Sequence, residues 1–132
     1  MVGILVTTHG MMAAGVIDSG AMIVGKQIHV EHISLTDTGI ENYIQRLTKL
    51  LHNMRTDYKE LLILCDLKSG TPYNECFRYI LQHGCDNEIK LIAGLNLPMY
   101  LETVLASRDM SLEDLSLVAE KSGKLNIELL VL

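Results

Sequence analysis

The residues best suited to chemistry lie in polar segments that directly follow apolar runs. Thr7-Thr8-His9-Gly10 follows one apolar run, and Asp66 opens the segment that follows another. An imidazole is nucleophilic through one ring nitrogen when the other nitrogen holds the proton, and a carboxylate bonded to that proton fixes this tautomer. The same carboxylate stabilises the positive charge that develops as the ring attacks. His9 and Asp66 are therefore the candidate nucleophile and its orienting group.

The segment after Asp66 also contains features that suit an anionic group. Thr71-Pro72 predicts the start of a helix, with Thr71 as the N-cap and Pro72 at the first helical position. The free N–H groups of a helix N-terminus bind phosphate without a fixed positive charge. Gly10 and Gly70 would let the backbone approach a ligand closely, and the Thr71 hydroxyl either caps the helix or donates to phosphate. These three residues are the candidate phosphate-binding residues.

Short β-rich runs alternate with helical periods, which predicts an α/β fold with a mostly parallel sheet. Strand character is found in the ranges 2–7, 28–35, 61–65, 89–93 and 126–132, and helical character in 12–24, 37–54, 72–84, a segment from 98, and 111–123. Ligands in such sheets bind beyond the carboxyl ends of the strands, where the strand order reverses. If the first and third strands are neighbours, His9 and Asp66 face each other there. Residues 94–98 form a third strand-end segment at the same edge.

The composition predicts a single domain over residues 1–132, with 48% apolar and 20% charged residues. The net charge of −5 argues against a nucleic-acid-binding protein, which usually needs a basic face. No apolar run approaches the roughly 20 residues of a membrane span, and the N-terminus lacks the features of a secretory signal. Cys65, Cys76 and Cys85 are odd in number and have no C-x-x-C spacing, which indicates reduced thiols and a cytoplasmic protein.

No motif points to a metal or a cofactor, and we expect neither. The sequence contains no H-E-x-x-H, P-loop or G-x-G-x-x-G motif, and His29 and His32 would lie on opposite faces of a strand. Cys65 is expected to pack in the core. Some residues that border the predicted crevice are candidates for docking partner proteins, with ordinary packing or solvation as the alternative: Met11, Met12, Lys68 and Met99.

Three blocks of sequence carry a family resemblance. The blocks are Ile4-Leu5-Val6-Thr7-Thr8-His9-Gly10, Asp66-Leu67-Lys68-Ser69-Gly70-Thr71-Pro72-Tyr73-Asn74 and Ala93-Gly94-Leu95-Asn96-Leu97-Pro98-Met99. In this order they resemble the enzyme IIA domain of the mannose family of the bacterial phosphotransferase system. The second block follows the family pattern D-x-x-x-G-[ST]-P-x-N, and the resemblance covers essentially the whole chain.

The resemblance implies a role for each candidate residue. His9 would become a transient phosphohistidine, Asp66 would pair with its ring, and Gly70 and Thr71 would help to hold the phosphoryl group. The donor would be the phosphocarrier protein HPr, and the acceptor would be a histidine- or cysteine-type site of enzyme IIB, with histidine expected in this family. The chain would then be a phosphotransferase component that serves sugar uptake through the membrane components IIC and IID.

The resemblance also implies a sheet of order 2-1-3-4 with helices on both faces, and a homodimer formed by exchange of the C-terminal strand. The apolar tail 127–132 fits such an exchanged strand, and an edge strand within one chain would look the same. The loop departs from the family pattern, which often has a Trp and a Gly-Gly pair where this chain has Lys68 and Ser69-Gly70. Leu67 stands where the family has Thr. These departures bear on partner specificity.

Two other functions fit the same residues. A regulatory IIA-like module of a transcriptional regulator would sense the phosphorylation state and pass nothing on. An unrelated α/β enzyme would use His9 as a general base and turn over a small substrate without a protein donor. The sequence names neither the sugar nor the cognate IIB, and it leaves open whether the chain is free-standing or a fragment of a longer one.

Overall fold

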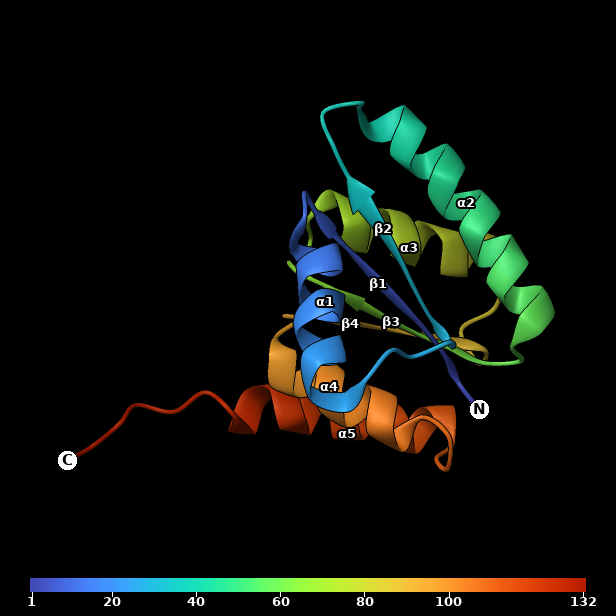
Figure 1. The fold of residues 1–132 in the computed structure, drawn as a ribbon. Coiled ribbons are helices and arrows are strands. Elements are labelled where there is room, and N and C mark those ends of the chain that lie inside the picture. Colours follow the sequence, from blue (N-terminus) through green and yellow to red (C-terminus); the bar gives the residue numbers. More distant parts are fainter.

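The computed structural model describes all 132 residues, and its centre is a sheet of four parallel strands in the order β2-β1-β3-β4 (Figure 1). The strands are β1 (Gly3–His9), β2 (Val30–Leu35), β3 (Leu61–Cys65) and β4 (Ile89–Ala93). The helices are α1 (Met12–Val24), α2 (Ile40–Asp57), α3 (Thr71–His83), α4 (Leu97–Ala106) and α5 (Leu112–Leu125). The predicted α/β fold and strand order are confirmed. No helix combines the length and the apolar character that a membrane span needs.

Helices cover both faces of the sheet and divide the core into two clusters. Ile4 and Val6 of β1 join α1, α4 and α5 in one cluster, whereas Leu5 joins α2 and α3 in the other. Side chains alternate along a strand, so one short strand contributes to both clusters. A parallel strand that is buried on both faces has a nearly continuous apolar sequence, and this is why β1 and β3 are recognisable before folding.

The register of the central strands brings the candidate residues to one edge of the sheet. β1 pairs with β3 in parallel, with Thr7 beside Cys65. Asp66 therefore leaves the carboxyl end of β3 next to the last residues of β1. The chain connections reverse direction between these two strands, so this edge is the position where α/β sheets bind ligands.

Helix α3 begins one residue earlier than predicted, and Thr71 is not its N-cap. Gly70 is the N-cap, and its carbonyl accepts the N–H of Asn74 at 2.9 Å. Thr71 is the first helical residue, so its hydroxyl is not used for capping. The N–H groups of the first helical turn have no partner within the helix, so a proline is tolerated at more than one position of that turn. Pro72 therefore does not fix the residue at which the helix starts, and the prediction is wrong.

Helix α5 begins as predicted but ends later. The Ser111 hydroxyl accepts the N–H of Asp114 at 3.2 Å, which is the expected cap. The helix then continues past Gly123 to Leu125. Gly123 is buried against α4, where a Cβ would lie 2.7 Å from the Met99 Cε. This glycine permits two helices to approach closely instead of stopping one of them.

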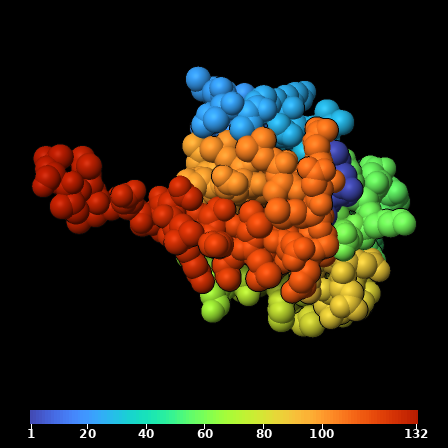
Figure 2. Space-filling view, turned by 90° about the horizontal axis from the view of Figure 1, so that it is seen from below, coloured from blue at the N-terminus to red at the C-terminus, as the bar shows by residue number.

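The fifth strand predicted at residues 126–132 is not formed within the chain. These residues pair with no strand and leave the end of α5 in a direction away from the body of the protein (Figures 1 and 2). Ile127 is 78% exposed and Leu129 is 85% exposed. The edge strand within one chain is therefore wrong, because α5 lies across one face of the sheet and directs the tail outward. Exchange of the tail between two chains stays a prediction.

A buried histidine holds the amino end of β2 to the end of α4. The His29 Nε2 lies 2.6 Å from the Ser107 hydroxyl, which itself donates to the Val104 carbonyl at 2.9 Å, so Nε2 carries the ring proton. Nδ1 has no hydrogen-bond partner. Burial lowers the pKa of His29 below its ordinary value of 6.5, and the charges of Arg108 and the chain's amino terminus lower it further.

We predict that this histidine destabilises the protein in mild acid. The folded state keeps the His29 ring neutral, while the unfolded chain binds a proton near pH 6.5, so the free energy of unfolding falls as the pH drops below that value. Urea unfolding between about pH 8 and about pH 5 measures the fall. The fall is expected to be smaller in His29→Gln, whereas His32→Gln, at an exposed position of β2, keeps it. Equal slopes in wild type and His29→Gln would contradict the prediction.

Candidate active site

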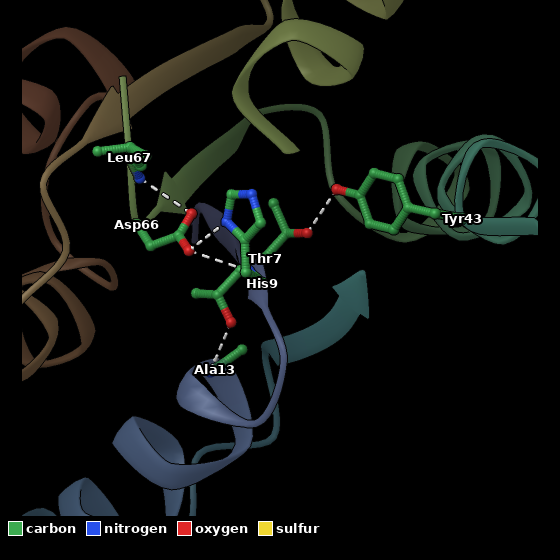
Figure 3. Close-up of polar contacts among 7 residues, drawn as sticks. Thr7, His9, Ala13, Tyr43, Asp66 and Leu67 are labelled. Carbon is green, nitrogen blue, oxygen red and sulfur yellow. Dashed lines mark hydrogen bonds and ion pairs between the residues drawn. The ribbon is translucent and has the colours of Figure 1, made fainter. Parts of the chain in front are cut away.

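His9 and Asp66 form a hydrogen-bonded pair at the carboxyl edge of the sheet (Figure 3). The His9 Nδ1 lies 2.7 Å from Asp66 Oδ2, and the same oxygen accepts the His9 backbone N–H at 2.9 Å. The other carboxylate oxygen accepts the N–H of Leu67 at 2.9 Å. The Asp66 side chain is 14% exposed and the His9 side chain 47%. The structure thus brings the two predicted residues together, with the carboxylate shielded and the ring open to solvent.

The hydrogen bonds keep the Asp66 carboxyl ionised. Burial raises its pKa, but the bonds from the His9 backbone and ring together lower it by more, so the pKa lies below its ordinary value. An ionised carboxylate only accepts hydrogen bonds, which places the shared proton on the His9 Nδ1. Nε2 then carries the lone pair. It lies on the side of the ring away from Asp66 and forms no hydrogen bond with the protein (Figure 3).

The turn between β1 and α1 determines where His9 points. Gly10 adopts a φ of +55° and donates its N–H to the Leu35 carbonyl at 2.8 Å. This N–H is therefore not free for phosphate, and Gly10 contributes the turn that no other residue adopts easily. The buried Thr8 hydroxyl accepts the N–H of Ala13 at 2.8 Å and so satisfies a donor in the first turn of α1 (Figure 3). Sequence reasoning missed Thr8, because it lies three residues before the N-cap position Met11, where no capping signal is expected.

The N-terminus of α3 lies against the His9 ring. A Cβ on Gly70 would come within 2.9 Å of the His9 Cε1 and 3.2 Å of a loop carbonyl, so glycine permits this close approach. The backbone N–H groups of Thr71 and Tyr73 form no hydrogen bond within the chain, and Pro72 between them has no N–H. Free donors and the positive end of a helix dipole are features that favour an anion, and here they lie beside the imidazole.

Residues 94–98, the third strand-end segment, form backbone hydrogen bonds with Asp66 and Cys65. The Gly94 N–H donates to the Asp66 carbonyl at 3.2 Å, and the Leu95 N–H donates to the Cys65 carbonyl at 3.0 Å. Asn96 caps α4 by accepting a backbone N–H at 2.9 Å. No hydrogen bond links this segment to the His9 ring. Its contribution is the position of the loop that carries the carboxylate.

The candidate docking residues are divided between the surface and the core. Met11 is 75% exposed and Met12 is 42% exposed, and Lys68 is also exposed. Met99 is only 3% exposed because it packs against α5, so the prediction that it docks partners is wrong. Leu67, which was not among the candidates, is 60% exposed and follows Asp66 directly. We call Met11, Met12, Leu67 and Lys68 the rim of the site.

His9 is open to solvent, and neither His9 nor Asp66 lines any of the larger cavities of the protein. A cavity of about 340 Å³ lies nearby, between the loop after β3, the free edge of β4 and α5. Lys68 and Tyr73 contribute to its lining, but neither His9 nor Asp66 does. Small-molecule sites are usually concave and enclose most of their ligand. An open histidine is better suited to a group that a second protein presents.

The cysteines take no part in this chemistry. All three are free and buried. Burial, together with the neighbouring Asp66 charge, raises the pKa of the Cys65 thiol to about 12. Cys65 therefore stays protonated at neutral pH and packs in the core, as predicted.

A comparison with protein-family models identifies the group to which the chain belongs. The model described as "PTS system fructose IIA component", EIIA-man, matches residues 3–119. The chain belongs to this IIA family of the phosphotransferase system. The relatives that the chain matches are named as sugar-specific components of the phosphotransferase system.

Individual relatives agree with this assignment. The chain is 30% identical to the "PTS system mannose-specific EIIAB component" of Escherichia coli K12 over 135 residues, which is 98% of this chain and 39% of that protein. It is 30% identical to the "PTS system sorbose-specific EIIA component" of Klebsiella pneumoniae over 115 residues, 87% of this chain and 82% of that protein. The crystal structure of EIIA from Streptococcus agalactiae superposes with a TM-score of 0.85 at 29% identity, covering 97% and 96% of the two chains. This IIA chain thus spans about two-fifths of the mannose-specific relative's length.

We predict that Gly70→Ala disturbs the His9–Asp66 pair. The added Cβ would meet the His9 Cε1 at 2.9 Å, so the ring or the loop must move and the 2.7 Å bond to Nδ1 weakens. Nitrogen NMR of the imidazole would show a changed tautomer balance. Gly15→Ala is the matched control, because a Cβ there meets nothing within 4 Å. An unchanged His9 spectrum in Gly70→Ala would argue against the close contact.

Proposed function

We propose that this IIA chain carries a phosphoryl group on His9 between two proteins of a sugar phosphotransferase system. The observation that carries the proposal is the bond between Asp66 and the His9 Nδ1, which leaves Nε2 free as a nucleophile. The ring is 47% exposed, so a second protein has access to it. Membership of the IIA family supports the same role.

In the first transfer, the lone pair of the His9 Nε2 attacks the phosphorus atom of phosphorylated HPr. The P–N bond forms as the bond between phosphorus and the donor atom of HPr breaks, and that electron pair leaves with HPr. The proton on Nδ1 stays in place, and the Asp66 carboxylate stabilises the positive charge that the ring acquires. Positioning and electrostatics supply most of the catalysis, because phosphoryl transfer needs little covalent help.

The N-terminus of α3 is the proposed phosphoryl-binding element. The free N–H groups of Thr71 and Tyr73 are placed to donate to phosphoryl oxygens, and Gly70 allows the helix to approach the ring. Because Gly70 is the N-cap, the Thr71 hydroxyl is also available as a donor. Gly10 contributes through its turn, since its N–H is already bound to Leu35.

In the second transfer, the lone pair of an acceptor atom of enzyme IIB, expected to be a histidine nitrogen in this family, attacks the phosphorus atom on His9 and forms the new bond. The P–N bond at Nε2 breaks, its electron pair returns to the ring, and the ring is again neutral with its proton on Nδ1. Enzyme IIB would then supply the sugar-phosphorylating step that accompanies uptake through IIC and IID. Neither transfer requires a cofactor, because the donor protein supplies the phosphoryl group.

The rim of the site is the proposed docking surface for both partners. Met11, Met12 and Leu67 expose apolar side chains around His9, and Lys68 adds a positive charge. Methionine adapts its shape to different surfaces, which suits a histidine that must meet HPr and IIB in turn. Exposed apolar side chains that gather in one region of a surface are typical of protein interaction sites.

The two alternative functions receive less support. The relatives at 27–30% identity are named as phosphotransferase system components, which does not favour the regulatory module. Family membership rules out an unrelated α/β enzyme. The absence of His9 from the larger cavities also argues against turnover of a small substrate without a protein donor.

We predict that the chain acquires one phosphoryl group on incubation with phosphoenolpyruvate, enzyme I and HPr, measured as intact mass. His9→Ala is expected to remain folded and to acquire none. Asp66→Asn is expected to slow transfer by about 10²-fold to 10⁴-fold, because an amide does not stabilise the charged ring. His32→Ala, at an exposed histidine of β2, should transfer at the wild-type rate. Phosphorylation of His9→Ala, or an unmodified wild type beside a labelled IIA control, would sink the proposal.

We further propose that two chains form a homodimer by exchanging their C-terminal tails. Leu130, Val131 and Leu132 are between 78% and 110% exposed, which is unfavourable for an isolated chain in water. β4 has a partner on one side only, so its other edge offers unpaired backbone groups. The tail of a second copy would satisfy this edge and bury its own apolar side chains.

Light scattering after size-exclusion chromatography tests the dimer. Wild type is expected at twice the 14.7 kDa of one chain, and a chain that ends at Leu125 is expected at the mass of a single shortened chain. Leu129→Asp should weaken the dimer because a charge on the exchanged strand would be buried. Glu128→Gln is the adjacent control and should remain dimeric. A monomeric wild type at micromolar concentration would refute strand exchange without affecting the proposed transfer.

A further inference from the structure

Ser69 is the only non-glycine residue of the chain with a positive φ, at +67°. The left-handed region is unfavourable for a residue with a Cβ, so neighbouring contacts must hold Ser69 in it. The residue lies in the loop between Asp66 and α3, directly before Gly70. The path of the loop past His9 therefore depends on an unfavourable conformation at one position.

Asn74 supplies a contact that holds this conformation. Its Nδ2 donates to the Ser69 carbonyl at 3.1 Å, and its backbone N–H donates to the Gly70 carbonyl at 2.9 Å. The group facing a carbonyl must be the amide nitrogen, because the side-chain oxygen has no proton to donate. Asn74 therefore binds two successive carbonyls and ties the first turn of α3 to the loop.

Asn74 binds the carbonyl of the peptide between Ser69 and Gly70, and Gly70 lies against the His9 ring. Gly70 lies so close to His9 that a Cβ would come within 2.9 Å of Cε1, and small movements of the preceding peptide therefore change this contact. The free N–H groups of Thr71 and Tyr73 belong to the same turn. No other side chain forms a hydrogen bond with the backbone of Ser69 or Gly70.

We infer that Asn74 is a positioning residue for phosphoryl transfer. It holds Ser69 in the left-handed conformation and thereby places the N–H groups of α3 beside His9. The inference rests on the proposed function. The Asn74 amide is turned back toward the loop, so it acts through the backbone and needs no contact with the phosphoryl group or with HPr.

Transfer from phosphorylated HPr, measured at increasing HPr concentration, tests the inference. Asn74→Ala is expected to lower the maximal rate between about 2-fold and 10-fold, with an unchanged half-saturating HPr concentration. Ser69→Gly in the same chain removes the conformational penalty, so the double variant should regain most of the lost rate. Asn53→Ala removes an exposed asparagine of α2 that forms no side-chain hydrogen bond, and it should transfer like wild type.

Three outcomes overturn the inference. The first is a wild-type rate in Asn74→Ala. The second is an effect confined to the half-saturating HPr concentration, which would mean that Asn74 contacts HPr. The third is a double variant that stays as slow as Asn74→Ala, because Asn74 would then act by a route other than Ser69. Urea unfolding of each variant ensures that rates are compared between folded proteins.

An NMR measurement separates this inference from the proposed function. A residue with φ near +60° has its amide and Hα protons unusually close, so Ser69 is expected to give a strong cross-relaxation signal between them. The signal should weaken in Asn74→Ala, and the His9 ring resonances should shift. If wild type accepts no phosphoryl group, the proposed function fails while this measurement still stands. An unchanged Ser69 signal in Asn74→Ala overturns the inference whatever the transfer assay shows.

Discussion

The hydrogen bond between the Asp66 carboxylate and the His9 Nδ1 is the interaction on which the site depends. Its partners lie 57 positions apart and meet only because β1 and β3 pair in parallel with Thr7 beside Cys65. Burial alone would favour a protonated Asp66, and the donors that surround the carboxylate reverse this preference. One bond thus determines the charge of the carboxylate, the tautomer of the ring and the nitrogen that remains reactive.

The backbone, and not a set of charged side chains, supports this pair. The Gly94 N–H holds the Asp66 carbonyl, the Gly10 turn directs the ring outward, and Gly70 brings α3 to the other side of the imidazole. No lysine or arginine forms an ion pair with Asp66. A helix terminus offers an anion donors without a full opposing charge, which suits a group that must be accepted and then released.

Buried residues lie beneath the site, and the residues of its rim are exposed to solvent. Thr8 is buried and accepts an N–H from the first turn of α1, while Met11 and Leu67 are largely exposed. The loop that carries Lys68 and Ser69 is the part that departs most from the family pattern, and it is also where backbone strain is found. The departures of this chain from the family pattern therefore lie in an exposed loop, and His9 and Asp66 lie at the ends of buried strands.

The sequence by itself determined the alternation of strands and helices, the His9–Asp66 pair and the family, because buried parallel strands and strand-end polar residues leave local signals. Only the tertiary structure decided the rest. Met99 is core because α5 covers it, the Gly10 N–H is unavailable because β2 ends beside it, and the apolar tail is unpaired because α5 directs it outward. Each of these outcomes depends on contacts between segments far apart in the chain, and a residue's type and local spacing contain no information about such contacts.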